Sequence, residues 1–174
     1  MLMKTKILDC TLRDGGYYTN WDFSSDVVKT YIETTNKLPV DYLEVGYRNK
    51  PTKEYMGKFG YTPVSILKKL RKSSNKKLAV MLNEKSTLPE DFDELLTPIK
   101  GLADMVRLAV DPKNFERAVV LAKAVKAMGF EVAFNTMYMS KWSTEYKGFL
   151  DNLSEINGVA DLFCMVDSFG GITP

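Results

Sequence analysis

The sequence of 174 residues contains no histidine. Without an imidazole, the chain by itself cannot form a Ser–His or Cys–His catalytic pair, nor a metal site that needs a histidine ligand. The chain has no large excess of charge of either sign, since it contains 24 basic and 22 acidic side chains. A net charge of +2 gives no reason to expect nucleic acid or an anionic membrane as a partner.

Cysteines are few, and long apolar runs are missing. Cys10 and Cys164 lie far apart in short apolar runs, and residues 1–8 contain no stretch long enough for a signal peptide or a membrane span. We therefore expect two reduced thiols in a cytoplasmic protein. With 45% hydrophobic residues, the composition is that of one globular domain, taken as residues 1–174.

Six short apolar runs alternate with longer segments of helical pattern. Each run is rich in Val, Ile, Leu or Phe and is nearly continuous rather than strictly alternating, which is typical of strands buried on both faces of a parallel sheet. These predicted strands cover residues 6–10, 40–46, 77–82, 104–110, 130–135 and 160–166.

The segments between the runs carry helix start and stop signals. Thr62-Pro63 and Asp111-Pro112 each place an N-cap before a proline, and Gly129 is placed to end the second of these helices. A region richer in Gly, Pro and Lys, residues 47–61, is predicted to be a loop or lid. The predicted helices cover residues 24–38, 64–72, 89–96, 114–128 and 144–156.

Alternating strands and helices predict an α/β fold with a parallel sheet. Two architectures fit: an open doubly wound sheet, or a (β/α)8 TIM barrel truncated after strand six. A complete barrel has about 250 residues, so this chain is expected to stop roughly two units short. Strands one and six would then have unpaired edges, which we expect to be covered by self-association, by loops or by a partial opening of the sheet.

In both architectures the active site lies at the carboxyl ends of the strands, where this sequence places several charged residues. Arg13 and Asp14 follow the first run, either as a solvated ion pair in a glycine turn or as a functional pair. Glu44 interrupts the second run, where an unpaired carboxylate is costly. Its partner is then either a nearby lysine or Arg13, since neighbouring strands make that contact easy.

Three more runs also place a polar residue at the same end. Arg107 lies in the fourth run, Asn135 ends the fifth, and Ser168 follows the sixth. Each alone is more simply explained as structural. Together they form the set of side chains that a concave site in a parallel barrel requires.

The run from Asp9 to Gly16, D-C-T-L-R-D-G-G, resembles the D-x-T-L-R-D-G motif of the DRE-TIM metallolyases. That superfamily includes 4-hydroxy-2-oxovalerate aldolase, hydroxymethylglutaryl-CoA lyase, and the isopropylmalate and citramalate synthases. The Asp, Arg and Glu of its name fall on Asp14, Arg13 and Glu44. The run D-S-F-G-G at 167–171 is similar to the D-S-x-G segment of the aldolase branch.

The resemblance implies a (β/α)8 TIM barrel truncated after strand six, from a carbon–carbon lyase that acts on a 2-oxo acid through a pyruvate enolate. Asp14 would bind a divalent cation, Mn²⁺ or Mg²⁺ with Zn²⁺ as an alternative, which chelates the substrate and withdraws electrons. Arg13, held by Glu44, would stabilise the enolate oxygen. Arg107, Asn135 and Ser168 would line the substrate pocket.

The chain departs from this family in two ways. The family's H-x-H ligands on strand seven are absent, so the remaining metal ligands are expected beyond residue 174, and the chain alone is expected to be inactive. Tyr17 stands where the aldolase branch has histidine and the synthases have glutamine, and a phenol of pKa about 10 is a poor base. Besides an aldolase, a Claisen-type acyl-CoA:2-oxo acid synthase and a non-catalytic binding or scaffold domain therefore stay open.

Overall fold

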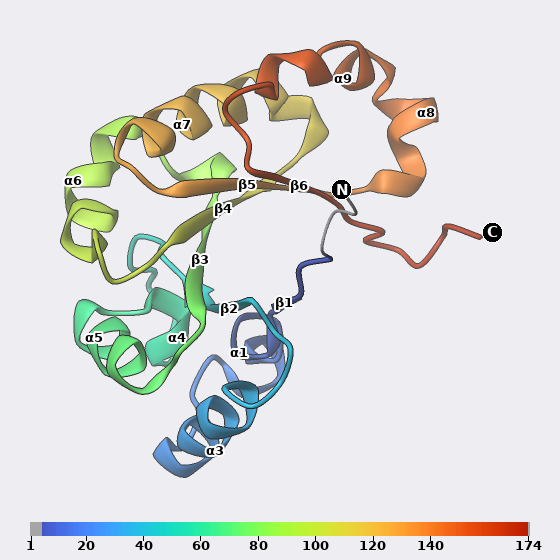
Figure 1. Ribbon diagram of the computed structural model, residues 1–174. Coiled ribbons are helices and arrows are strands. Elements are labelled where there is room, and N and C mark those ends of the chain that lie inside the picture. Colours follow the sequence, from blue (N-terminus) through green and yellow to red (C-terminus); the bar gives the residue numbers. More distant parts are fainter. Residues whose placement is uncertain (1–4, 174) are drawn as a thin grey trace.

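The computed structural model describes residues 5–173, and a sheet of six parallel strands forms its centre. The strands lie side by side in the order of the sequence, and the sheet curves with the helices on its outer side (Figure 1). This is the arrangement of an open part of a (β/α)8 barrel. The strands are β1 (Leu8–Asp9), β2 (Tyr42–Tyr47), β3 (Lys77–Asn83), β4 (Met105–Val110), β5 (Glu131–Thr136) and β6 (Leu162–Met165).

All six predicted strands are present, and the doubly wound alternative is wrong. A doubly wound sheet reverses its strand order at a switch point, whereas here each strand pairs in parallel with the next one along the chain. The helices are α1 (Thr11–Asp14), α2 (Gly16–Thr19), α3 (Ser25–Thr35), α4 (Lys58–Tyr61), α5 (Val64–Ser73), α6 (Phe92–Leu95), α7 (Phe115–Ala127), α8 (Trp142–Glu145) and α9 (Lys147–Asp151).

Alternate side chains of each strand lie on opposite faces of the sheet. One set packs against the helices in the main core, and the other set faces the concave side. The outer set includes Leu43, Val80, Leu108 and Phe134. The concave set includes Tyr42, Met81, Met105 and Ala133, and the strand period places Glu44, Arg107 and Asn135 on this same side.

The first strand is shorter than predicted, because only Leu8–Asp9 rather than residues 6–10 pair with β2. As an end strand it has one neighbour, and the chain turns into α1 directly after it. The backbone N–H of Asp14 donates to the Cys10 carbonyl at 2.7 Å, which closes a helical turn. Arg13 and Asp14 therefore lie on a helical turn above the end of the strand.

Two predicted helices are broken into short turns. The segment 89–96 keeps only α6, between 3-10 turns at Pro89–Asp91 and Thr97–Ile99, because prolines punctuate both sides. The segment 144–156 contains the end of α8, α9 and a 3-10 turn at Leu153–Ile156. The backbone leaves helical geometry at Tyr146, with φ −127° and ψ 38°.

The predicted loop at 47–61 contains α4 at its end, and hydrogen bonds from the buried side chain of Arg48 hold it in place. The Arg48 guanidinium donates to the carbonyl oxygens of Tyr61, Thr62, Glu94 and Leu95. Burial lowers the pKa of Arg48. These contacts join the connection after β2 to α4 and α6.

Between residues 5 and 173 no helix is long and apolar enough to cross a membrane. The prediction that the chain starts without a signal peptide concerns residues 1–8, of which 1–4 lie outside the described part. Cys10 and Cys164 are both free thiols.

Candidate active site

Glu44 of β2 joins two arginines at the carboxyl ends of the strands. Its side chain is 0% exposed, and Oε2 lies 2.8 Å from both Arg13 Nε and Arg107 Nη1. Arg13 comes from α1, directly after β1, whereas Arg107 comes from β4 on the concave side. One carboxylate oxygen therefore fixes two guanidinium groups that are distant in the sequence.

The network continues to β5, because Arg107 Nη2 donates to the Asn135 side-chain oxygen. Burial acts to lower the pKa of Arg13, but the charge and hydrogen bond of Glu44 outweigh it, so the pKa ends above its ordinary value. The two guanidinium groups share one buried carboxylate, and the further carboxylate on Arg13, that of Asp14, is exposed to solvent. The cluster can therefore stabilise negative charge that develops in a reaction on the concave side.

Two polar atoms of the network have no hydrogen-bond partner among the described residues. These atoms are Glu44 Oε1 and Arg107 Nε, and both are shielded from solvent. Buried polar atoms in folded proteins nearly always have a partner, so unpaired ones deserve an explanation. A water molecule or a polar ligand on the concave side would satisfy them.

Asp14 lies at the solvent side of this cluster. Its side chain is 63% exposed, and Oδ1 accepts from Arg13 Nη1 at 2.7 Å. In the described part of the chain, no three His, Cys, Asp or Glu side chains lie close enough together to hold a metal ion. One exposed carboxylate does not fix a divalent cation, so these residues alone do not form a metal site.

Tyr17 lies beside the network rather than within it. Its hydroxyl is 2.8 Å from the hydroxyl of Tyr47 on β2, and its side chain is largely exposed. Burial, together with the hydrogen bond to Tyr17, raises the pKa of Tyr47. Tyr47 therefore stays protonated near neutral pH and is not placed as a ready base.

Trp21 is a site residue that the sequence did not point to. Its Nε1 donates to the Arg13 carbonyl at 2.8 Å, and its ring meets those of Tyr17 and Tyr47 edge to face. A Cβ at Gly16 would lie 2.0 Å from Trp21 Cδ1, so the second glycine of the motif leaves room for this indole. Gly16, which stands shortly before Trp21, is the feature of the sequence that could have indicated this contact.

Ser168 lies at the same end of the sheet but outside the network. It is exposed after β6, and its Oγ accepts from the Tyr138 backbone N–H at 3.0 Å. The neighbouring Asp167 accepts from the backbone N–H groups of Ile172 and Gly171, which lower its pKa. The hydroxyl hydrogen of Ser168 stays available to a ligand, because this serine acts there as an acceptor.

Cys10 is a half-buried thiol between β1 and α1, close to the charged cluster. Burial is the main cause that raises its pKa, while the positive charge of Arg13 acts in the opposite direction. The thiol therefore stays protonated near neutral pH and is not an activated nucleophile.

Comparison with known proteins shows similarity to solved structures. No protein-family model matches the chain, and no curated protein matches it. Among solved structures, the chain is similar to the crystal structure of the N-terminal domain of a putative aldolase from Bacteroides vulgatus, with 71% sequence identity and a TM-score of 0.95. The match covers 98% of this chain and 56% of that one. In sequence and in fold, this chain therefore spans just over half of the length of that N-terminal domain chain.

Proposed function

We propose that this chain supplies the first six strands of an aldolase barrel that cleaves or forms a carbon–carbon bond next to a 2-oxo acid. The observation that carries the proposal is the buried Glu44 carboxylate with Arg13 and Arg107 at 2.8 Å each. It is supported by the D-C-T-L-R-D-G-G motif and by the similarity to the N-terminal domain of a putative aldolase. A cytoplasmic location is part of the same proposal.

The chemistry follows from the charges of the cluster. Cleavage next to a 2-oxo group leaves an enolate, whose oxygen gains negative charge in the transition state. Arg13 would stabilise that oxygen, because Glu44 and Asp14 hold its guanidinium in one orientation. Arg107 and Asn135, already joined to each other, would orient the substrate from the concave side, with Ser168 as a further donor.

A divalent cation would lower the energy of the same enolate by withdrawing electrons from the 2-oxo acid. Asp14 is the one carboxylate of the cluster that is open to such an ion. Since the described residues do not complete a site, the proposal requires further ligands beyond residue 174.

The test uses the protein encoded by the complete gene. Pyruvate release from 4-hydroxy-2-oxo acids is measured with added Mn²⁺ and again after removal of metal by a chelator. We expect Asp14→Asn and Arg13→Lys each to lower the rate by about 10²-fold or more, as for other groups that stabilise a developing oxyanion. The matched control, Asp26→Asn in the exposed first turn of α3, should keep the full rate. Equal rates for the wild type and Asp14→Asn would remove Asp14 from the mechanism.

One observation favours a second candidate, a binding or scaffold domain without catalysis. Tyr17 stands in place of the histidine base of the aldolase branch, and its hydroxyl is hydrogen-bonded to that of Tyr47. In that case the complete protein would bind a 2-oxo acid but release no pyruvate. A Claisen-type synthase is distinguished by adding acyl-CoA with the 2-oxo acid and measuring the free thiol that forms.

A further inference from the structure

We propose that the cleft between α3 and α5 binds the monomeric anion of a medium-chain fatty acid. The cleft lies on the outer, helical side of the sheet, whereas the cluster around Glu44 lies at the carboxyl ends of the strands. The proposal therefore goes beyond the proposed function and does not depend on it.

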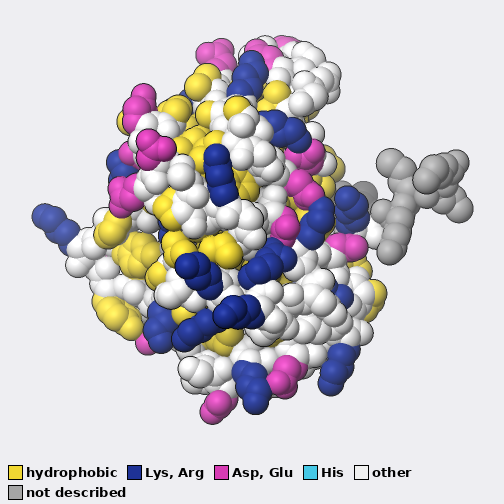
Figure 2. All heavy atoms as spheres, turned by 60° about the vertical axis from the view of Figure 1, so that its left-hand side comes forward, with side chains coloured by type: hydrophobic (Ala, Val, Ile, Leu, Met, Phe, Trp, Pro, Cys, Tyr) yellow, Lys and Arg dark blue, Asp and Glu magenta, His cyan; other side chains and the backbone are white. Residues whose placement is uncertain are grey.

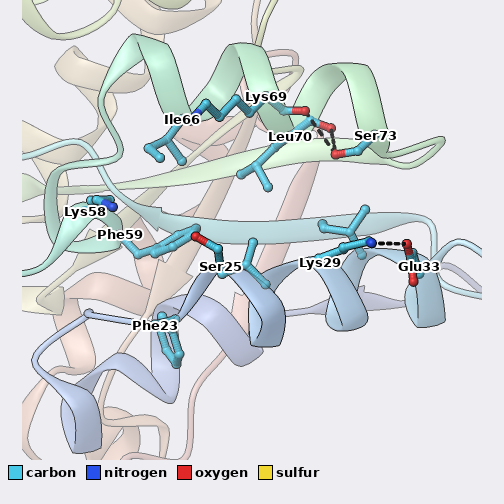
Figure 3. Close-up of a pocket in the computed structure, with 12 residues that line it drawn as sticks. Phe23, Ser25, Lys29, Glu33, Lys58, Phe59, Ile66, Lys69, Leu70 and Ser73 are labelled. Carbon is cyan, nitrogen blue, oxygen red and sulfur yellow. Dashed lines mark hydrogen bonds and ion pairs between the residues drawn. The ribbon is translucent and has the colours of Figure 1, made fainter.

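The cleft has a volume of about 410 Å³ and a floor of apolar side chains. This volume lies in the lower part of the range of small-molecule sites, roughly 300–1,000 Å³. Three floor residues, Ile32, Phe59 and Leu70, belong to the buried core, so the floor is fixed before any ligand arrives. The apolar lining consists of Phe23, Val28, Ile32, Phe59, Ile66 and Leu70 (Figure 3).

The charges around the cleft are unevenly placed. Within residues 5–173, the lining lysines Lys58 and Lys69 have no carboxylate partner. Their amines lie toward the end of the cleft near Phe59 and Ile66 (Figure 3). At the opposite end, Lys29 is 4.0 Å from Glu33 and this pair is neutral overall. One end of the cleft is therefore positive, and the other is neutral.

An apolar cleft with a positive end matches a ligand with one anionic head and one hydrocarbon chain. Each methylene buried against the floor favours binding, while the carboxylate stays near solvent beside the two amines and keeps most of its hydration. A neutral alcohol lacks the attraction to the lysines, and a cationic amphiphile is repelled by them. On the face of the molecule that carries α5, basic side chains lie next to exposed hydrophobic ones (Figure 2).

The first experiment titrates the isotope-labelled 174-residue chain with decanoate below its micelle concentration and follows backbone amide signals by NMR. We expect saturable shifts at Ile32, Phe59 and Leu70, and little change at Glu44 or Arg107. Decyltrimethylammonium and 1-decanol should bind at least about tenfold more weakly, as expected when charge complementarity adds to apolar contact.

The second experiment reverses the two unpaired charges with Lys58→Glu/Lys69→Glu. We expect about tenfold weaker decanoate binding, because two attractive charges become repulsive. The matched control is Lys68→Glu/Lys72→Glu, which makes the same change of net charge at exposed positions of α5 outside the cleft lining. It should bind decanoate within about twofold of the wild type. Circular dichroism and thermal unfolding verify that both variants are folded.

Four outcomes would overturn the proposal. They are an absence of saturation below the micelle concentration, equal binding of 1-decanol, an equal loss of affinity in both double variants, and binding only to phosphatidylglycerol vesicles. None of them bears on pyruvate release by the complete protein, so the two proposals fail independently.

Discussion

At the scale of single residues, Glu44 explains why a carboxylate interrupts an otherwise apolar strand. It is fully buried, and it holds Arg13 and Arg107 through one oxygen. A buried charge is tolerated when it is paired and hydrogen-bonded, and removal of one partner leaves the others uncompensated.

We therefore expect Glu44→Gln to lower the free energy of unfolding by about 3 kcal/mol, since the buried Arg107 would lose its counter-charge and Arg13 would keep only the exposed Asp14. Chemical denaturation measures this change. The control Glu33→Gln alters a surface pair on α3 and should change stability by less than about 0.5 kcal/mol. Similar values for the two variants would show that Glu44 is not a structural counter-ion.

Glu84 is a second buried carboxylate, at the end of β3. Burial is the main cause that raises its pKa from the ordinary 4.5, although hydrogen bonding from Asn114 and the charge of Arg117 act to lower it. Because the folded chain holds this proton more tightly than the unfolded chain, the stability that the group contributes is present below pH 4.5 and is lost as the pH rises through the folded-state value.

The Glu84→Gln variant mimics the protonated form at every pH. Its melting temperature relative to the wild type should therefore rise between about pH 4 and pH 7, as the wild-type carboxyl ionises. Thermal unfolding of both proteins over this range gives the difference, with the exposed Glu116→Gln as the control. A difference that shrinks with rising pH would contradict the raised pKa.

At the scale of elements, the site depends on the helical turn α1 and on the indole that supports it. Trp21 binds the carbonyl of Arg13, and both Asn20 and Trp21 have positive φ, 51° and 56°. Non-glycine residues with such angles are uncommon, so the surrounding contacts must maintain them. Gly16 and Gly57 make this possible by letting the chain approach Trp21 closely.

Replacement of Gly16 by alanine should displace the indole, because the new Cβ would lie 2.0 Å from Trp21 Cδ1. We expect a loss of about 1–3 kcal/mol in stability, as for other overpacked positions, together with a changed near-ultraviolet circular dichroism signal. Gly148→Ala is the matched control, since its Cβ would meet no atom within 4 Å and it lies in α9. That variant should be neutral or more stable by up to about 1 kcal/mol.

Several elements could be predicted from the sequence because their signals are local. The six strands follow from nearly continuous apolar runs, and α7 follows from apolar residues at helical spacing. Asp111, predicted as the N-cap of this helix, instead caps the 3-10 turn Pro112–Asn114 just before it and accepts from the Lys113 backbone N–H. The helix predicted over 89–96 is broken where prolines flank α6, and the one predicted over 144–156 is broken where the backbone leaves helical geometry at Tyr146. Arg48 and Trp21 act through contacts between separate loops, which no local pattern encodes.

At the scale of the whole molecule, β1 and β6 are the two end strands of the sheet. Leu162 and Met165 of β6 are exposed, Met165 by 64%. An exposed strand edge with apolar side chains is a surface for pairing with another chain. We therefore keep self-association through these edges as a proposal for the 174-residue chain.

Met165→Lys tests this proposal, because a charge on an edge strand opposes pairing. Analytical ultracentrifugation of the wild type should show an average mass that rises with concentration, and the variant should stay closer to the single chain. Val120→Lys, at an exposed position of α7, is the control and should associate as the wild type does. A wild type that remains a single chain at every concentration would reject the proposal.

The sequence by itself determined the α/β class, the six buried strands and the polar residues at their carboxyl ends, because buried parallel strands are encoded locally. The part-barrel that the family resemblance implied is confirmed, but only the tertiary structure decided that Glu44 is shared by Arg13 and Arg107 and that Ser168 lies apart from them. The physical reason is that side chains from separate units meet only after strand register and sheet curvature are set. Those quantities depend on packing between units rather than on any one segment.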